Sequence, residues 1–307
     1  MGCISVNHIR SRAMCQQIKT EKVILANGEQ IYYRESGKGP VLVLLHGNMT
    51  SSFHLEEFIK SISSGVRVIA PDMRGFGLSS YKQPISSLNE LSDDVADLLN
   101  QLNVEHYAIA GWSTGGGVAM QHCIDHREKV SQLVLMSSIG ITGYPIKSNG
   151  GQGDYLKSKQ AILDDPMFAP VFSAFENNDK AFVRGLWDMV VYNHKKPAAE
   201  TYELLIDDVL TQVNLADIYF SLSVFNLSDD SNGVIHGNSQ IHKFKTPTLI
   251  LHGDDDLVIP VGTALNTHRE LKECGELVSL KTYPNSGHSL FIDQIQDISH
   301  QVLTFIK

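Results

Sequence analysis

Short apolar runs alternate with longer segments of helical periodicity along most of the chain. The apolar runs are Val41–Leu45, Val66–Ala70, Tyr107–Ala110, Leu133–Met136 and Thr248–Leu251. Residues 53–63 and 88–102 lie between them, and in 88–102 leucine and valine recur at helical spacing. Strands that are apolar on both sides are typical of a parallel sheet with helices on both faces. The pattern therefore predicts an α/β fold with a mostly parallel sheet.

Residues 21–35 form two strand-like runs around Asn27-Gly28. This dipeptide is a strong hairpin signal, because a type I′ turn needs a positive φ at both central residues. We therefore expect a β-hairpin here, with residues 1–20 as an N-terminal extension and residues 21–139 as the first part of the core.

Residues 140–243 break the alternation and separate the fourth apolar run from the fifth. A structureless loop of this length is rare in a compact domain, so we expect a helical cap, with residues 244–307 completing the core. The segment is rich in aromatic residues: Phe168, Phe172, Phe175, Phe182, Trp187, Tyr192, Tyr202, Tyr219, Phe220 and Phe225. They are expected either to line a pocket or to form the cap's own small core.

Residues 111–115 read G-W-S-T-G directly after an apolar run and before an apolar helix. In this setting G-x-S-x-G is typical of a nucleophile elbow, a turn so tight that Gly111 and Gly115 relieve backbone crowding. Ser113 then stands at a helix N-terminus, where the dipole favours developing negative charge. The backbone N–H of Thr114, the next residue, is a candidate donor to an oxyanion.

A serine hydroxyl needs a base, and the base needs an orienting carboxylate. Residues 248–260, T-L-I-L-H-G-D-D-D-L-V-I-P, place Asp254, Asp255 and Asp256 at the end of an apolar run. Residues 283–293 carry His288 in a loop after another strand-like segment. The order serine, acid, histidine fits the elbow, and the spacing alone requires only that one of the aspartates faces the histidine.

At this point the chain resembles an α/β-hydrolase from about residue 20 onward. The motifs H-G-N, D-M-R-G-F-G-L-S-S, G-W-S-T-G-G-G, G-D-D-D-L-V-I-P and S-G-H stand in the family's order. The G-W-S-T-G-G-G stretch is similar to bacterial serine esterases, cofactor-free perhydrolases and some acyl-homoserine-lactone hydrolases.

The resemblance implies Ser113 as nucleophile and His288 as general base. The family's Gly-x-x-Asp-x-x-(Val/Ile)-Pro pattern selects Asp256 as the acid, and similarity to H-G-x relatives makes the Asn48 backbone a second oxyanion donor. Trp112 flanks the nucleophile and is a candidate substrate-binding residue, although it is equally expected to pack behind the elbow.

The composition limits the classes of binding partner and the cellular location that we expect. The net charge is −9, which disfavours nucleic acid and anionic membranes as main partners. The four cysteines form no C-x-x-C pair, and no apolar run reaches the ~18 residues of a membrane span. We therefore expect a cytoplasmic protein with free thiols, no secretion signal and no stable membrane insertion. Oligomeric state is not predicted.

Two motifs suggest cofactors but lack a required residue. His122 and His126 have the i, i+4 spacing of a zinc pair, but Cys123 stands where the zincin motif needs glutamate. Residues 75–80, G-F-G-L-S-S, end in Ser80 where the dinucleotide fingerprint needs glycine. The expected protein therefore uses no metal and no cofactor.

These inferences predict a serine hydrolase that cleaves a carboxylic ester or lactone of a small to medium acyl group. Perhydrolysis stays open, because the same residues can pass an acyl group to peroxide. Two alternatives from other classes are a ligand receptor with slow turnover and a hydrolase of carbon–carbon bonds in dioxo acids. The physiological substrate is not predicted.

Overall fold

The computed structural model describes residues 17–306, which are built around an eight-stranded sheet in the order β1-β2-β4-β3-β5-β6-β7-β8. The strands are β1 Lys19–Ile24, β2 Gln30–Ser36, β3 Val41–Leu45, β4 Arg67–Pro71, β5 Tyr107–Trp112, β6 Val130–Met136, β7 Thr248–Gly253 and β8 Val278–Tyr283. β3 to β8 pair in parallel, whereas β1 and β2 are antiparallel at one edge. The predicted α/β class with a mostly parallel sheet is confirmed.

The first hairpin exists, but its turn differs from the expected type I′. β1 pairs with β2 from Lys19 to Ile24, so the sheet begins inside the expected extension, whose residues 1–16, with Cys3 and Cys15, lie outside the described residues. Of the Asn27-Gly28 pair, only Gly28 has a positive φ, +85°. The Gly28 N–H donates to Leu25 O, so Gly28 follows the turn in the left-handed region rather than forming it.

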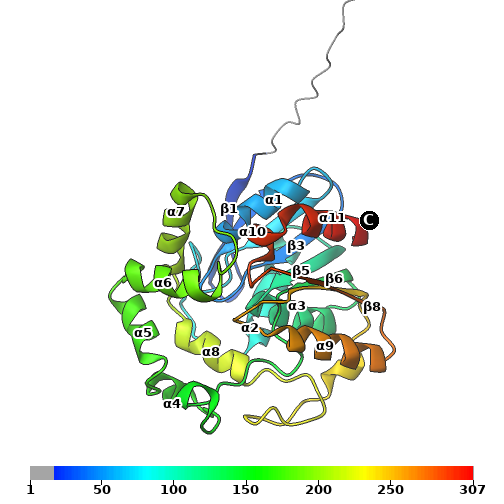
Figure 1. The fold of residues 1–307 in the computed structure, drawn as a ribbon. Helices are drawn as coiled ribbons and strands as arrows, with labels where there is room; N and C mark the ends of the chain where they lie inside the picture. Colours follow the sequence, from blue (N-terminus) through cyan, green and yellow to red (C-terminus); the bar gives the residue numbers. More distant parts are fainter. Residues whose placement is uncertain (1–16, 307) are drawn as a thin grey trace, which may run out of the picture.

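Side chains of the central strands alternate between two apolar layers, as a strand buried on both faces requires. In β3, Val43 and Leu45 pack on the face covered by α2, α3 and α9, and Leu42 and Leu44 pack on the face covered by α1 and α11 (Figure 1). The core helices are α1 Glu56–Ile62, α2 Leu88–Gln101, α3 Thr114–Asp125, α9 Val261–Glu273, α10 Leu290–Asp293 and α11 Ile295–Phe305, with a 3₁₀ turn η1 Ser52–Leu55.

Residues 140–243, which we call the cap segment, are inserted between β6 and β7. Their helices are α4 Lys159–Leu163, α5 Ala169–Glu176, α6 Lys180–Val190, α7 Ala199–Val209 and α8 Leu215–Ser223, with 3₁₀ turns η2 Asn149–Gly151 and η3 Gln240–Lys243. Figure 1 shows α4 to α8 gathered on one side of the sheet. Within residues 17–306 no helix is both long and apolar enough to cross a membrane.

Candidate active site

Ser113 occupies the turn between β5 and α3 with φ 55° and ψ −120°. A non-glycine residue rarely takes such a conformation, which costs of order 1–3 kcal/mol. A Cβ on Gly111 would lie 2.3 Å from Gly115 O, and one on Gly115 would lie 2.4 Å from His46 O. The two glycines therefore permit a turn that no larger residues fit, and Ser113 stands at the carboxyl edge of the sheet beside the N-terminus of α3.

Asp256, in the loop after β7, is the aspartate that faces the histidine. Its Oδ2 lies 2.8 Å from His288 Nδ1, and its Oδ1 accepts the backbone N–H groups of Val258 and Ile259 at 2.9 Å each. Burial favours the neutral acid, but His288 and His252 outweigh it and hold the pKa of Asp256 well below its ordinary value. Asp256 is therefore a carboxylate with a fixed orientation.

His288 lies in the loop between β8 and α10, and neighbouring groups fix this loop on two sides. The Trp112 indole N–H donates to His288 O at 2.9 Å, and the Gly287 N–H donates to Asp293 Oδ2 at 2.8 Å. Because Asp256 accepts from Nδ1, the neutral imidazole carries its proton there and its Nε2 is left as a base.

Asn48 and Thr114 both line the cavity that Ser113 lines, and each has a backbone N–H group without an acceptor among the described residues. Thr114 is the first residue of α3, where N–H groups have no intrahelical acceptor. Asn48 follows β3, and none of the described residues accepts a hydrogen bond from its N–H. The Asn48 side chain is already engaged, since its Oδ1 accepts from Gln212 Nε2 at 2.8 Å.

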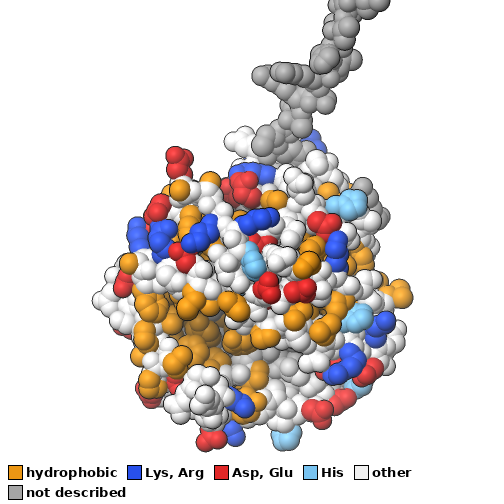
Figure 2. Space-filling view, viewed as in Figure 1, with side chains coloured by type: hydrophobic (Ala, Val, Ile, Leu, Met, Phe, Trp, Pro, Cys, Tyr) orange, Lys and Arg blue, Asp and Glu red, His pale blue; other side chains and the backbone are white. Residues whose placement is uncertain are grey.

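Ser113, His288, Asn48 and Thr114 all line one cavity of about 190 Å³. The rest of its wall is apolar or aromatic: Met49, Trp112, Ile139, Tyr144, Phe168, Leu186, Trp187, Val190, Val191, Tyr219, Leu222, Val258 and Ile259. Among these described lining residues there is no Lys, Arg, Asp or Glu. Figure 2 shows apolar side chains gathered around a hollow on the face over α5, α6 and α8.

Comparisons with known proteins agree with this architecture. The sequence profile of the alpha/beta hydrolase fold matches residues 40–294. The chain belongs to the α/β-hydrolase family. A bifunctional esterase/perhydrolase of Acinetobacter calcoaceticus is 25% identical over 296 residues, which cover 93% of this chain and 99% of that protein.

Two further comparisons, one with a curated sequence and one with a solved structure, give other members of the family. A 2-hydroxy-6-oxo-6-(2'-aminophenyl)hexa-2,4-dienoic acid hydrolase of Metapseudomonas resinovorans is 23% identical over 291 residues, 94% of this chain and 91% of that protein. The structure of an esterase from Exiguobacterium antarcticum superposes with a TM-score of 0.73 at 19% identity, covering 93% of this chain and 98% of that one. The structural similarity shows the fold, and the two curated relatives differ in their named activities, so the substrate stays open.

Trp112 in this α/β-hydrolase has a position that fits both expectations, and its contact with a substrate stays a prediction. It lines the cavity, yet its side chain is among the largest that are fully buried, at 1% exposure. Its ring packs edge-on against Phe291 at 4.6 Å and lies 5.4 Å from the His288 ring, as measured between centroids. Holding the histidine loop is the role that its contacts define.

The aromatic residues of the cap segment fall into two groups, those that line the cavity and those that pack among themselves. Phe168, Trp187 and Tyr219 line the cavity. Tyr192 instead packs between Tyr202 and Trp187, at centroid distances of 5.2 and 5.3 Å, and all three rings are buried within the cap segment. The periodicity of the sequence does not separate the two groups, because Phe168 and Tyr192 lie outside the helices and the other members lie on helices with mixed faces.

His122, which the sequence offers as half of a zinc pair, and His46 of the H-G-N motif both have structural partners. His122 Nε2 lies 2.6 Å from the Tyr107 hydroxyl, and burial lowers the pKa of His122 to about 3. His46 Nε2 accepts the Met73 N–H at 2.9 Å and so shapes the loop after β3. Within residues 17–306, no group of three or more His, Cys, Asp or Glu side chains is arranged to hold a metal ion.

Sequence reasoning gave His252 a structural role but missed its contact with the acid, and it missed Gln212 entirely. His252 Nε2 lies 2.8 Å from Ile259 O and 3.3 Å from Asp256 Oδ2, so it forms a second contact with the acid. Its only sequence signal is its place one residue before Gly253 at the end of β7. Gln212, between α7 and α8, has no sequence signal at all, because its partners at the cavity, Asn48 and Met49, lie about 160 positions away.

Proposed function

We propose that this α/β-hydrolase is a serine hydrolase that cleaves an uncharged carboxylic ester or lactone of a small to medium acyl group. The observation that carries the proposal is the Asp256–His288 pair, whose imidazole lines the same cavity as the strained Ser113. A serine beside an oriented imidazole is the arrangement that acyl transfer requires.

In the proposed reaction, Ser113 Oγ attacks the carbonyl carbon and His288 Nε2 accepts the hydroxyl proton. The backbone N–H groups of Asn48 and Thr114 stabilise the tetrahedral oxyanion. When the carbon–oxygen bond breaks, His288 returns the proton to the leaving alkoxide. A water molecule, deprotonated by His288, then attacks the acyl-enzyme and releases the acid and Ser113. Asp256 orients the imidazole and stabilises the imidazolium.

The cavity supports an uncharged, compact substrate. An engineered cavity of about 150 Å³ in another protein binds benzene, so about 190 Å³ suits an acyl or alkoxy group of that order. A dioxo acid carries a carboxylate, and burying it without a cationic partner is costly. The lack of Lys and Arg among the described lining residues therefore favours ester hydrolysis over carbon–carbon hydrolysis.

The proposal includes a cytoplasmic enzyme, since Cys123 and Cys274 are both free thiols. Perhydrolysis differs only in the acceptor, because peroxide replaces water in the second step. A slow ligand receptor differs in turnover, which a kinetic experiment measures directly.

The test is hydrolysis of p-nitrophenyl butyrate by the wild type and by Ser113→Ala. We expect sustained turnover in the wild type and a loss of at least ~10³-fold in the variant, since the nucleophile is removed. A wild type that releases a single equivalent of p-nitrophenol and then stops would favour the receptor. Undiminished turnover in Ser113→Ala would reject the proposed mechanism.

A further inference from the structure

A chain of side-chain amides joins the cap segment to the loop after β3. Gln212 is at its centre and is 5% exposed. Its Oε1 accepts the Met49 N–H at 2.8 Å, and its Nε2 donates to Asn48 Oδ1 at 2.8 Å and to Asn214 Oδ1 at 2.9 Å. Asn214 Nδ2 in turn donates to Arg74 O at 2.7 Å. The chain therefore runs from the Arg74 carbonyl to Asn48.

The direction of every hydrogen bond in this chain is fixed by backbone groups. The Arg74 carbonyl only accepts, so Asn214 must present its NH₂ there and its oxygen toward Gln212. The Met49 N–H only donates, so Gln212 must present its oxygen there and its NH₂ toward both asparagines. Asn48 can then offer Gln212 only its oxygen.

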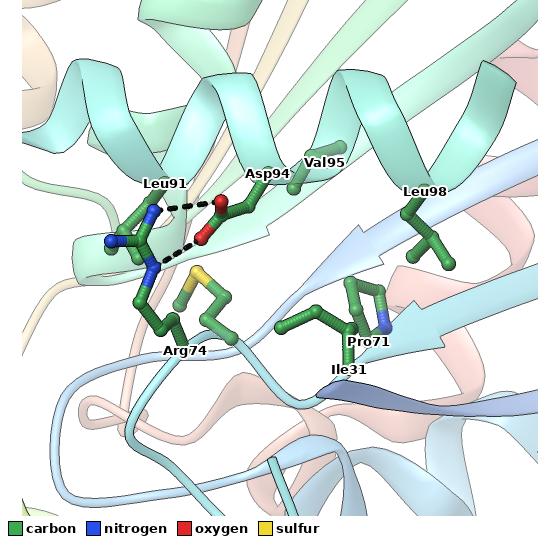
Figure 3. A pocket seen from close by; sticks show the side chains of 8 residues that line it. Ile31, Pro71, Arg74, Leu91, Asp94, Val95 and Leu98 are labelled. Carbon is green, nitrogen blue, oxygen red and sulfur yellow. Dashed lines mark hydrogen bonds and ion pairs between the residues drawn. The ribbon is translucent and has the colours of Figure 1, made fainter. Parts of the chain in front are cut away.

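The far end of the chain is itself anchored in the core. The Arg74 guanidinium holds Asp94 on α2 with two hydrogen bonds of 2.6 and 2.7 Å, and both side chains are nearly buried (Figure 3). Apolar neighbours such as Leu91 and Ile31 line the void beside this pair, whose volume of about 10 Å³ admits no organic ligand. The ion pair therefore restrains Arg74, and its carbonyl is a fixed acceptor for Asn214.

The orientation of Asn48 has a chemical consequence at the cavity. Its oxygen is occupied by Gln212, and none of the described residues accepts from its Nδ2. Because Asn48 lines the cavity beside Ser113 and Thr114, this NH₂ group is available to a bound ligand. Met49, the next residue, has a φ of +57°, and the bond from its N–H to Gln212 stabilises that uncommon conformation.

We propose that Gln212 is a positioning residue. It turns the Asn48 side-chain amide so that Nδ2 donates to the oxyanion, in addition to the backbone N–H groups of Asn48 and Thr114. This inference rests on the proposed function, and it assigns to the cap segment a part in transition-state stabilisation. A donor that is oriented before the reaction contributes more than one that must reorient during it.

The first experiment compares Gln212→Glu and Gln212→Met with the wild type, using p-nitrophenyl butyrate. The carboxylate still accepts the Met49 N–H but no longer donates, so the Asn48 amide must turn over and face the oxyanion with its oxygen. The methionine leaves Asn48 unrestrained without adding a charge. We expect kcat to fall by roughly 10- to 100-fold, with KM within about threefold, since only the transition state loses a donor.

The matched control is Gln152→Glu, the same substitution at an exposed glutamine of the cap segment, which is expected to leave kcat and KM unchanged. Folding is checked by circular dichroism, and Gln212→Met carries the test if Gln212→Glu does not fold. A kcat within twofold of the wild type in the folded Gln212 variants overturns the proposal.

A double-mutant cycle with Asn48→Ala tests whether Gln212 acts through Asn48. Once the Asn48 amide is gone, Gln212→Met is expected to lower kcat by less than twofold further. An equal loss with and without Asn48 shows a merely structural role and overturns the proposal.

Binding of phenylboronic acid, followed by calorimetry, gives a readout that does not depend on turnover, because boronic acids form tetrahedral adducts with serine. We expect the dissociation constant to rise in the Gln212 variants by the same factor as kcat falls. A wild type that neither hydrolyses esters nor binds the boronic acid rejects the proposed function together with this inference. A fully active wild type with unaltered Gln212 variants rejects the inference alone.

Discussion

The cavity has two walls. The core wall carries Ser113 and His288, with Asp256 behind them, and the cap wall carries Phe168, Leu186 and Trp187. The two walls differ in how their side chains are held. On the core wall, Ser113 is fixed by a strained turn, and His288 and Asp256 are fixed by hydrogen bonds of 2.8–2.9 Å. On the cap wall, Phe168, Leu186 and Trp187 make mainly apolar contacts. Directional bonds set positions within tenths of an ångström, whereas apolar packing sets only volume and shape.

This difference separates chemistry from selectivity. The core wall is expected to act as a unit, so that the loss of any member is severe. The cap wall is expected to tolerate substitutions and to change which acyl group is accepted. Gln212 is the exception, because it is a cap residue whose partners belong to the core wall.

The largest effect is expected on the core wall, from Asp256→Asn. The amide cannot stabilise an imidazolium, and its NH₂ group opposes the Nδ1–H tautomer of His288. We expect kcat with p-nitrophenyl butyrate to fall by about 10³- to 10⁴-fold.

Asp254→Asn is the matched control, since Asp254 is an exposed aspartate of the same loop. It should keep wild-type kcat and KM. If Asp254→Asn were as damaging as Asp256→Asn, the assignment of the acid to Asp256 would be wrong.

A smaller effect is expected on the cap wall, from Leu186→Ala. Leu186 lines the cavity, and its truncation removes apolar surface that a longer acyl chain contacts. We expect kcat/KM for p-nitrophenyl hexanoate to fall roughly five- to thirtyfold, with little change for the acetate. Met189→Ala, on the same helix but 60% exposed, is the control and should change neither value. Equal losses for the two esters would show that Leu186 affects chemistry rather than selectivity.

The two walls also differ in how far the sequence predicts them. Each core-wall element ends a buried strand, and glycines accompany the turns at Ser113, Asp256 and His288. The parallel sheet then brings these strand ends to one edge, so local patterns suffice to propose the catalytic residues. The spacing of the residues alone does not choose among Asp254, Asp255 and Asp256, because only the path of the loop after β7 turns Asp256 toward His288. The family pattern, by contrast, selects Asp256.

The cap wall was not predictable to the same depth. The helical insertion follows from the length and periodicity of residues 140–243, but the facing of each helix depends on contacts with the core. Gln212 lies in a turn, where periodicity carries no information, and its bonds to Asn48 and Met49 form only when cap and core are assembled. The prediction of a type I′ turn at Asn27-Gly28 was wrong. The loop has one residue more than a two-residue hairpin, and Gly28 follows the turn.

The last effect concerns stability rather than activity, and it again comes from the core. Burial lowers the pKa of His46 to about 4 and that of His122 to about 3, from an ordinary value near 6.5. Below pH 6.5 the unfolded chain binds protons that the folded protein does not accept until pH 4 or lower. The free energy of unfolding should therefore decrease as pH falls from 6.5 to 4, by about 1.4 kcal/mol per pH unit for each such histidine.

Urea unfolding between pH 7 and 4.5 measures this slope. Gln at position 122 accepts and donates hydrogen bonds but does not titrate, so His122→Gln should reduce the slope by about 1.4 kcal/mol per pH unit even if it lowers stability at pH 7. His106→Gln, at an exposed histidine, should keep the wild-type slope. A slope unchanged by His122→Gln would mean that His122 gains its proton in the folded protein near the ordinary pH. The surroundings of His122 would then be more accessible to water than its burial in the structure implies.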